Sequence, residues 1–228
     1  TTDPSSRWLI LDNAYWDSTN KYVVLTNTSP GEQRGRIFWN QNISLQNWVM
    51  KFRYKAGGGS GGDGMVFMFY KNKSYTPVPG GGYLAFEGSA GYGIEFDNLR
   101  NGGEPSSNHI ALIKDSVGNH LIYVNDSKTE DNLWHNVTVI VAGGSVTVIL
   151  DNNTLFSWNG AINRTFGGFG FSAATGSYTN WHMIDDVNFT SEIPICTGDV
   201  NSDRIINIFD LAAVGLAFGS KPGDANWN

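Results

Sequence analysis

The sequence predicts an all-β protein in which two sheets pack face to face as a sandwich. Short apolar runs recur along the chain, separated by turns rich in Asn, Asp, Ser and Gly. Runs of this length at regular turn spacing are typical of sandwiches. Helix-forming residues are sparse, whereas the 228 residues include 28 Gly, 13 Phe, 9 Tyr and 8 Trp. The aromatic residues supply the material for a large core.

We expect strands at twelve places before residue 190, and no helix of ordinary length there. The expected strands cover residues 8–11, 22–25, 35–39, 47–54, 65–70, 94–97, 109–113, 121–124, 134–141, 145–150, 168–172 and 182–189. Ala142-Gly143-Gly144 joins two of them and predicts a hairpin. The glycine-rich stretch 57–64 leads directly into an apolar strand, so we interpret it as a tight functional turn and not as a linker.

Charge and cysteine usage restrict the class of protein. The net charge of -6 argues against nucleic-acid binding, and no apolar run is long enough to insert in a membrane. The single cysteine, Cys196, excludes a disulfide within the chain. Glycosylation sequons begin at Asn27, Asn42, Asn72, Asn125, Asn136, Asn152, Asn163 and Asn188. Together these features favour a secreted or cell-surface glycoprotein of prokaryotic (archaeal or bacterial) origin, with Thr1 the start of a mature or trimmed chain.

The stretch from Ile94 to Ile110 gathers the residues best suited to bind a metal. Alternation along the strand 94–97 puts Glu95 and Asp97 on one face. Asn101, Glu104 and His109 follow within a short loop. Oxygen ligands suit calcium, and an imidazole with carboxylates suits manganese or a related ion. The alternative is a solvated acidic loop that happens to contain a histidine.

The C-terminal segment predicts a second calcium site. Oxygen donors stand at the EF-hand loop positions, with Asp in place of the final Glu: Asp199, Asn201, Asp203, the Ile205 carbonyl, Asn207 and Asp210. Arg204 stands where a glycine usually makes the sharp turn. Apolar residues at helical spacing follow, so we expect a short helix after the loop.

Several motifs of residues 1–191 together resemble the legume (L-type) lectin family. Ile94-Glu95-Phe96-Asp97 is similar to its Val-Glu-Phe-Asp strand. Glu104-Pro105-Ser106 followed by His109-Ile110 is similar to its Asp-Pro-Ser…His-Ile-Gly segment. Gly62-Asp63-Gly64 and Gly80-Gly81-Gly82-Tyr83-Leu84 match its Ala-Asp-Gly and Gly-Gly-Gly-Tyr-Leu motifs, in the same order. The resemblance implies a concanavalin A-like jelly roll over residues 1–191.

The resemblance implies two metal ions on the loop. A manganese-type ion would be held by Glu95, Asp97, Glu104 and His109. A calcium ion would be held by Asp97, Asn101, Glu104 and the Leu99 carbonyl. The family has Asp where Glu104 stands, one methylene shorter, so the geometry of this ligand is expected to differ.

The resemblance also implies a carbohydrate site beside the metals. Asp63, after a cis peptide bond from Gly62, would accept hydrogen bonds from sugar hydroxyls. The Gly82 N–H and the Asn101 amide would donate to the sugar. Residues 175–178 would form the variable specificity loop, with the Ser177 N–H a donor and Tyr178 beside it.

Leu99 is the second departure from the family, which usually has an aromatic residue there that stacks on the sugar ring. Loss of that stacking predicts weaker binding. Another ring would have to replace it, and the candidates are Tyr83, Tyr92, Tyr178 and Trp181.

Residues 199–228 resemble the first repeat of a dockerin, joined to the lectin-like part by a linker at 192–198. Gly198 to Leu211 matches the dockerin pattern except at Arg204. Dockerins usually carry two such repeats, so we interpret this segment as truncated and the chain as part of a multimodular protein. A cohesin-like domain or neighbouring modules would be its partners.

The lectin interpretation makes the chain a binding module for a glycan or polysaccharide, not an enzyme. One alternative is a structural or adhesion module with a vestigial sugar site. Another is a glycoside hydrolase of the same fold, which needs a second carboxylate a few residues after Asp97, where Asn98 to Asn101 stand instead. The remaining histidines, His120, His135 and His182, are expected to be ordinary residues without ligand roles.

Overall fold

The computed structural model describes residues 3–40, 47–70, 78–87, 90–160, 162 and 167–191. Within them the chain forms fourteen β-strands and three 3-10 helices of three residues each, so the all-β prediction is confirmed. The strands are β1 (Trp8–Asp12), β2 (Tyr15–Asp17), β3 (Tyr22–Thr26), β4 (Arg34–Trp39), β5 (Trp48–Gly57), β6 (Gly64–Tyr70), β7 (Gly91–Asp97), β8 (His109–Lys114), β9 (Ser116–Asn125), β10 (His135–Ala142), β11 (Ser145–Leu150), β12 (Asn153–Asn159), β13 (Gly168–Ala174) and β14 (Trp181–Thr190). The short helices are η1 (Pro4–Ser6), η2 (Gly81–Tyr83) and η3 (Ser127–Thr129).

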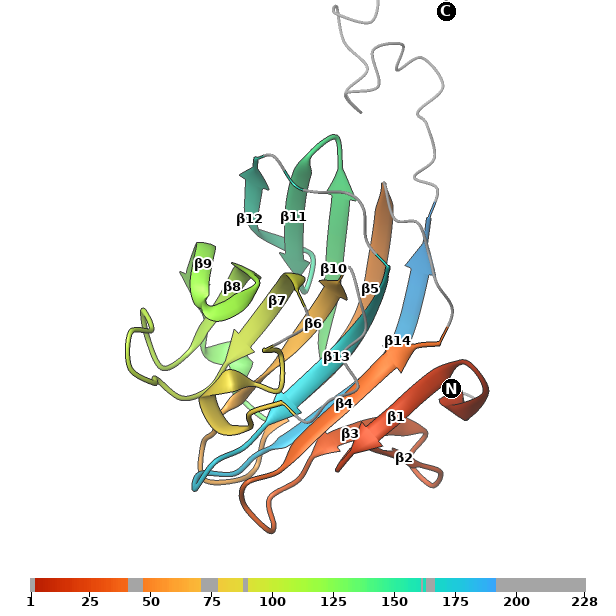
Figure 1. Ribbon diagram of the computed structural model, residues 1–228, viewed down its shortest axis with the longest axis vertical. Coiled ribbons are helices and arrows are strands. Elements are labelled where there is room, and N and C mark those ends of the chain that lie inside the picture. The colour runs from red at the N-terminus through yellow and green to blue at the C-terminus, as the bar shows by residue number, and fades with distance from the viewer. Residues whose placement is uncertain are drawn as a thin grey trace, which may run out of the picture. The chain divides into compact units, whose positions relative to one another are not determined.

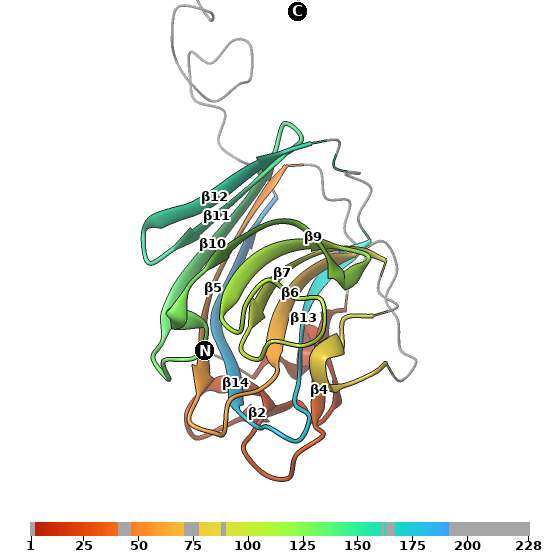
Figure 2. The same ribbon diagram turned by 90° about the vertical axis from the view of Figure 1, so that its left-hand side faces the viewer.

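The strands form two seven-stranded sheets. The front sheet has the order β1-β4-β13-β6-β7-β8-β9, and the back sheet has the order β12-β11-β10-β5-β14-β3-β2 (Figure 1). Neighbouring strands are antiparallel throughout, and β10 and β11 form the expected hairpin. Figure 2 shows the two layers from the side, with β10–β12, β5 and β14 in one and β7, β6, β13 and β4 in the other. The predicted sandwich is therefore confirmed.

The two sheets bury different amounts of their outer faces. Along β5, buried and partly exposed residues alternate, so Trp48 and Phe52 face the core while their neighbours face outward. By contrast, β6, β7 and β13 are buried at every residue. The outer face of the front sheet is covered by Leu84 and Phe86, which follow η2 and pack on side chains such as Met68. Polar groups on that outer face are therefore shielded from solvent.

Strand boundaries differ from the sequence pattern in three places. The pattern did not indicate β2 or β12, which are short or largely polar edge strands of the back sheet. It indicated only residues 121–124 of β9, because the first half of that strand lacks apolar alternation. The pairing of β8 with β9 also changes register on both sides of Ile113. These irregularities determine where the β9 side chains point.

The C-terminal predictions lie outside the described residues. They comprise the linker at 192–198 and the calcium loop with Asp199, Asn201, Asp203, Ile205, Asn207 and Asp210. Both stay predictions. No helix in the described part of the chain has the length and apolar character needed to cross a membrane.

Candidate functional site

Two carboxylates and an imidazole lie together on the outer face of the front sheet. On β7, Ile94 and Phe96 point into the core, so Glu95 and Asp97 take the opposite face. His109, the first residue of β8, is the direct cross-strand partner of Asp97. All three polar side chains are fully buried. The prediction that Glu95 and Asp97 share one face is confirmed.

His120 on β9 joins this cluster. Its Nε2 lies 3.0 Å from Oε2 of Glu95 and 3.3 Å from Nε2 of His109. The His109 Nε2 lies 3.3 Å from the same Glu95 oxygen. These three residues each offer a ligand atom within 4.8 Å of the others. His120 therefore lies against two of the residues predicted to bind a metal, although the sequence assigned it no ligand role.

The irregular pairing of β8 with β9 explains this placement. The register shifts on both sides of Ile113, and His120 becomes the cross-strand partner of that residue. Bulges of this kind re-aim a side chain relative to a regular ladder. Ala111, the cross-strand partner of Glu95, lies between His109 and Ile113 on the same face. Its small side chain leaves room there for two imidazole rings.

Asp97 approaches the cluster from a different direction. Its Oδ1 lies 3.9 Å from Nδ1 of His109, whereas Glu95 and His120 face the Nε2 atom of that ring. Asp97 and Glu104 lie outside the group whose ligand atoms are within 4.8 Å of one another, and the four-residue set for a manganese-type ion stays a prediction. The structure gathers Glu95 and His109 with His120, and places Asp97 beside Glu104.

Three buried carboxylate oxygens here lack a well-formed hydrogen bond from the described residues, although the Leu99 N–H acts to lower the pKa of Asp97. They are Oε1 of Glu95 and both oxygens of Asp97. Burial raises the pKa of Asp97 to about 10, and the nearby carboxylates of Glu104 and Glu95 add to the effect. Buried acids that lack partners are costly, and a bound cation removes that cost by supplying the opposite charge. The donor set therefore fits divalent cations.

The loop after β7 is held by contacts with its own backbone. The Glu104 carboxylate accepts the N–H of Asn101, and the Asn101 side-chain amide donates to the Leu99 carbonyl at 3.1 Å. Arg100 Nε donates to the Glu104 carbonyl at 3.2 Å. Burial raises the pKa of Glu104, and the Asn101 N–H opposes that shift. The residues predicted to hold calcium thus lie in one ordered segment, and their ligand roles stay predictions.

The turn before β6 brings Asp63 against this loop. The peptide bond between Gly62 and Asp63 is cis, as the resemblance implied. The Asp63 N–H donates to the Ala174 carbonyl at 3.1 Å, and the Asp63 carbonyl accepts the Asn98 N–H at 2.8 Å. The Asp63 side chain is buried, and its Oδ2 has no partner among the residues that the structure describes. One carboxylate oxygen is thus left available to a ligand.

Gly82 and Asn101 lie next to Asp63. A Cβ at Gly82 would overlap the side-chain amide of Asn101, so only glycine allows this approach. Burial raises the pKa of Asp63, while the Asn101 side chain and the Gly176 N–H act to lower it. The structure therefore brings together, from three separate loops, three of the residues that the resemblance assigned to sugar contacts.

Partly exposed side chains surround this point. Leu99 and Tyr178 both contact Gly62, where a Cβ would lie 2.7 Å from Cβ of Tyr178 and 3.4 Å from Cδ2 of Leu99. The rings of Tyr83 and Tyr178 are 54% and 53% exposed. Ser177, on the same loop as Tyr178, is also exposed. An exposed tyrosine, Tyr178, thus contacts the residue before Asp63, and a second, Tyr83, directly follows Gly82.

Tyr92 is excluded as a replacement for the missing stacking residue. It points into the core between the sheets, where it stacks on Phe69 with ring centroids 5.7 Å apart. Strand alternation on β7 explains this position, since Tyr92 shares a face with Ile94. Trp181, at the start of β14, is only partly buried and packs beside Gly58.

A buried chain of hydrogen bonds supports the loop from beneath. Asn98 donates from Nδ2 to the Thr129 carbonyl, so its Oδ1 accepts from Nε2 of His182 at 2.7 Å. The Nδ1 of His182 lies 2.7 Å from the Thr26 hydroxyl. Burial lowers the pKa of His182 to about 3, which keeps the ring neutral. Because Asn98 opens the loop after β7, this chain holds the start of the site in place.

Among the cavities in the described part of the chain, two differ in their position relative to the site. The smaller, of about 290 Å³, adjoins the Asp63 site and is lined by Glu32, Arg34, Gly80, Gly81, Thr175 and Gly176. The larger, of about 820 Å³, lies elsewhere, between Trp39 and Phe189 among others. Its acids Asp185 and Asp186 are paired with Arg53. We place the site at the loops, where buried carboxylate oxygens lack partners.

Comparison with known proteins gives a family and a fold. A model of the legume-like lectin family matches residues 3–140. None of the curated proteins compared with the chain matches it.

Several solved structures share the architecture. The exoplasmic/lumenal domain of VIP36, with Ca2+ and Man bound, has a TM-score of 0.70 at 21% identity and covers 83% of this chain and 85% of its own. Basic winged bean lectin with Tn-antigen has a TM-score of 0.70 at 19% identity, covering 83% and 94%. The Lotus tetragonolobus seed lectin has a TM-score of 0.69 at 16% identity, covering 85% and 96%. At these identities the likeness shows the fold.

Proposed function

The chain belongs to the legume-like lectin family, and from this premise we propose that it is a metal-dependent carbohydrate-binding module without catalytic activity. One observation carries the proposal above all others. The buried Asp63 carboxylate keeps an unpartnered oxygen at the point where the Gly82 turn and the Asn101 loop meet.

Sugar recognition needs acceptors, donors and a flat apolar surface close together. Each sugar hydroxyl both donates and accepts a hydrogen bond. Asp63 would accept, while the Gly82 N–H, the Asn101 amide and the Ser177 N–H would donate. Tyr178, together with Leu99, would pack on the carbon face of the ring. The exposed Tyr178 beside Gly62 supports this assignment, because Leu99 has no ring of its own.

The metals would act by ordering the binding loop. In the proposed site, calcium is held by Asp97, Asn101, Glu104 and the Leu99 carbonyl, and a transition ion by Glu95 and His109. A bound cation supplies positive charge to the buried carboxylates and fixes the backbone that carries Asn101. A loop already ordered loses less entropy when sugar binds.

The structural relatives agree with this class of ligand. The VIP36 domain has been solved with Ca2+ and with Man, Man2 or Man3GlcNAc, and winged bean lectin with Tn-antigen. We propose a glycan ligand for this chain on that basis, at a cell surface or in a secreted protein of prokaryotic origin. The C-terminal calcium loop and a cohesin-like partner belong to the same proposal and rest on sequence alone.

The test is calcium-dependent glycan binding by the full chain, comparing wild type with Asp63→Asn. The substitution keeps the size of the side chain and removes a charged acceptor. We expect binding to a glycan array, and affinity in calorimetry, to fall by at least tenfold, as for loss of about 1.5–3 kcal/mol from a charged hydrogen bond. The matched control is Asp17→Asn at the last residue of β2 in the back sheet, where the carboxylate accepts the Thr19 and Asn20 N–H groups of the following turn.

The other outcomes separate the alternatives. Wild type that binds metal but no glycan would contradict the lectin proposal and favour a structural module, with Leu99 as the suspected cause. Cleavage of laminarin or xyloglucan would indicate a glycoside hydrolase. Equal binding by Asp63→Asn and wild type would place the sugar elsewhere.

A further inference from the structure

The cluster of Glu95, His109 and His120 differs from the ligand set that the sequence implied. That set contained a single imidazole among carboxylates. The structure places a second imidazole at the same point, with Nε2 of His120 3.3 Å from Nε2 of His109. The nearest carboxylate oxygen, Oε2 of Glu95, lies 3.0 Å and 3.3 Å from the two nitrogens.

The ring of His109 is oriented by contacts at the nitrogen that points away from the cluster. Its Nδ1 faces two acceptors, the Ser106 carbonyl at 3.2 Å and Oδ1 of Asp97 at 3.9 Å. With Nδ1 held in this way, Nε2 is the ring nitrogen that faces His120 and Glu95. A carbonyl that holds the far nitrogen in this way is the usual support for a metal-ligating histidine.

The distances fit one ion bound by all three groups. A tetrahedral ion with metal–nitrogen bonds of about 2.0–2.1 Å requires two ligating nitrogens about 3.3 Å apart. The Glu95 side chain is fully buried, and its second oxygen has no partner among the described residues. These are independent signs that the cluster is built around a cation.

We propose that His120 is a metal ligand, and that with His109 and Glu95 it makes a nitrogen-rich site selective for zinc-class ions over Mn2+ and Ca2+. Imidazole nitrogen favours Zn2+, Co2+ and Ni2+, whereas hard oxygen sites favour Ca2+, Mg2+ and Mn2+. The inference deepens the metal dependence of the proposed lectin site. It concerns ion choice alone and is measured without sugar.

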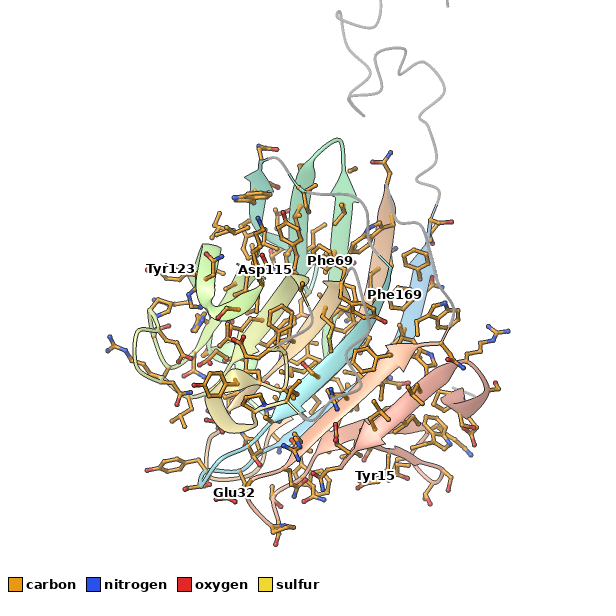
Figure 3. The ribbon with its side chains drawn as sticks, in the orientation of Figure 1. Tyr15, Glu32, Phe69, Asp115, Tyr123 and Phe169 are labelled. Carbon is orange, nitrogen blue, oxygen red and sulfur yellow. The ribbon has the colours of Figure 1, made fainter. Side chains whose placement is uncertain are left out.

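The other histidines do not compete for the ion. The chain has four histidines. Both ring nitrogens of His135 contact carboxylates, and both of His182 contact buried polar groups. Tyr123 lies beside the cluster, with its ring centroid 6.2 Å from that of His109 and 6.5 Å from that of His120 (Figure 3). It offers a neighbouring position for a control.

The experiment titrates the metal-free full chain with ZnCl2, MnCl2 and CaCl2 and compares wild type with His120→Phe and Tyr123→Phe. His120→Phe keeps a ring and removes the nitrogen, while Tyr123→Phe keeps a ring and removes a hydroxyl. We expect His120→Phe to weaken Zn2+ binding by at least about tenfold and to change Mn2+ and Ca2+ binding much less. Tyr123→Phe should bind all three ions as wild type does.

X-ray absorption of the zinc-loaded wild type gives a result that does not depend on the folding of a variant. The proposal requires two imidazole ligands in the zinc shell. One imidazole, or equal Zn2+ affinity in wild type and His120→Phe, would overturn it and leave His120 as a protonated partner of Glu95. Absence of glycan binding with these metal results intact would count against the lectin proposal alone.

Discussion

Two clusters of ionisable groups, each containing a buried histidine, lie in this sandwich, and they differ in how completely their polar atoms are paired. In the metal cluster, Glu95 and Asp97 together leave three carboxylate oxygens without partners among the described residues. In the second cluster, His135 lies between two acids, with Nδ1 2.7 Å from Asp151 and Nε2 2.9 Å from Asp131. Both ring nitrogens of His135 are therefore satisfied by protein atoms.

The difference separates a ligand-binding site from a structural cluster. We call the structural cluster of His135, Asp131, Asp151 and Lys128 the clamp. A fully paired cluster holds the chain together and needs nothing from solution. His135 begins β10, and Asp151 lies on the turn beyond β11, so their contact closes that part of the back sheet. A cluster with unpaired buried acids is complete only when a cation joins it. Three changes test whether this distinction holds.

The largest expected effect is at Asp97. Relative to wild type, Asp97→Asn should have a higher free energy of unfolding without metal and a lower one with metal. In chelator, Asp97→Asn should stabilise the protein by about 2 kcal/mol, because it removes a buried acid that lacks a partner. With metal at a hundred times its dissociation constant, the free energy of unfolding of wild type should rise by about 2.7 kcal/mol, and that of the variant by far less. Urea unfolding with and without metal measures both. Glu32→Gln, at an exposed carboxylate, is the control; an Asp97→Asn that is destabilised in chelator would break the comparison.

A smaller effect is expected at the clamp. His135→Gln should cost about 2–3 kcal/mol in urea unfolding, through loss of two charged hydrogen bonds. The cost should be the same with metal and with chelator. A loss that appears only in the metal-bound protein would mean that the two clusters are not separate.

The clamp also predicts a pH dependence. Burial alone would lower the pKa of His135, but the hydrogen bonds to Asp131 and Asp151 outweigh it and raise the pKa. A group whose pKa is higher in the folded state contributes its full stabilisation below its unfolded pKa, about 6.5 for histidine. That contribution to the free energy of unfolding is lost as pH rises through the folded pKa. The difference between wild type and His135→Gln should therefore shrink at alkaline pH.

Acid should remove the contribution of the Asp151 carboxylate to the stability of the clamp. Burial acts to raise the pKa of Asp151, but hydrogen bonds from His135, the Asn136 N–H and Lys128 lower it to about 2. Its contribution is present above the unfolded value and is lost as pH falls toward 2. A flat difference between the His135→Gln and wild-type stabilities from pH 3 to pH 9 would contradict this account.

The smallest effect is expected at the edge of the clamp. Lys128 lies 3.0 Å from Asp151, and its side chain is 37% exposed. Lys128→Met keeps the apolar stem and should cost less than about 1 kcal/mol, with the loss shrinking further in high salt. A cost as large as that of His135→Gln would show that the ammonium, and not the buried ring, holds Asp151.

Residues in regular strands were predictable, because the two-residue repeat determines their face. Alternation was enough to place Glu95 and Asp97 together and to put Ile94 in the core. The same rule excludes Tyr92 from the sugar site once the face of β7 is known. The approach of Asp63 to Asn101 followed only from the family resemblance, since no spacing rule brings two distant loops together.

His120 shows where prediction from sequence stops. Its position depends on register shifts beside Ile113, and bulges leave no periodic signal in the polar half of β9. The sequence pattern also did not predict the strands β2 and β12. The reason is related, because edge strands with solvated faces lack apolar alternation. Single-residue irregularities thus decided the ligand set, while the overall sandwich depended on many consistent signals.

The hydrogen bond from His182 to Asn98 has a practical consequence. Its Nε2 proton lies in the interior beneath the loop, in a ring that is fully buried. A proton held there exchanges slowly with bulk water, so proton NMR can detect it as a separate downfield resonance. Because Asn98 opens the loop that carries Asn101, that resonance would report loop geometry directly, in a sample to which neither ion nor saccharide has been added.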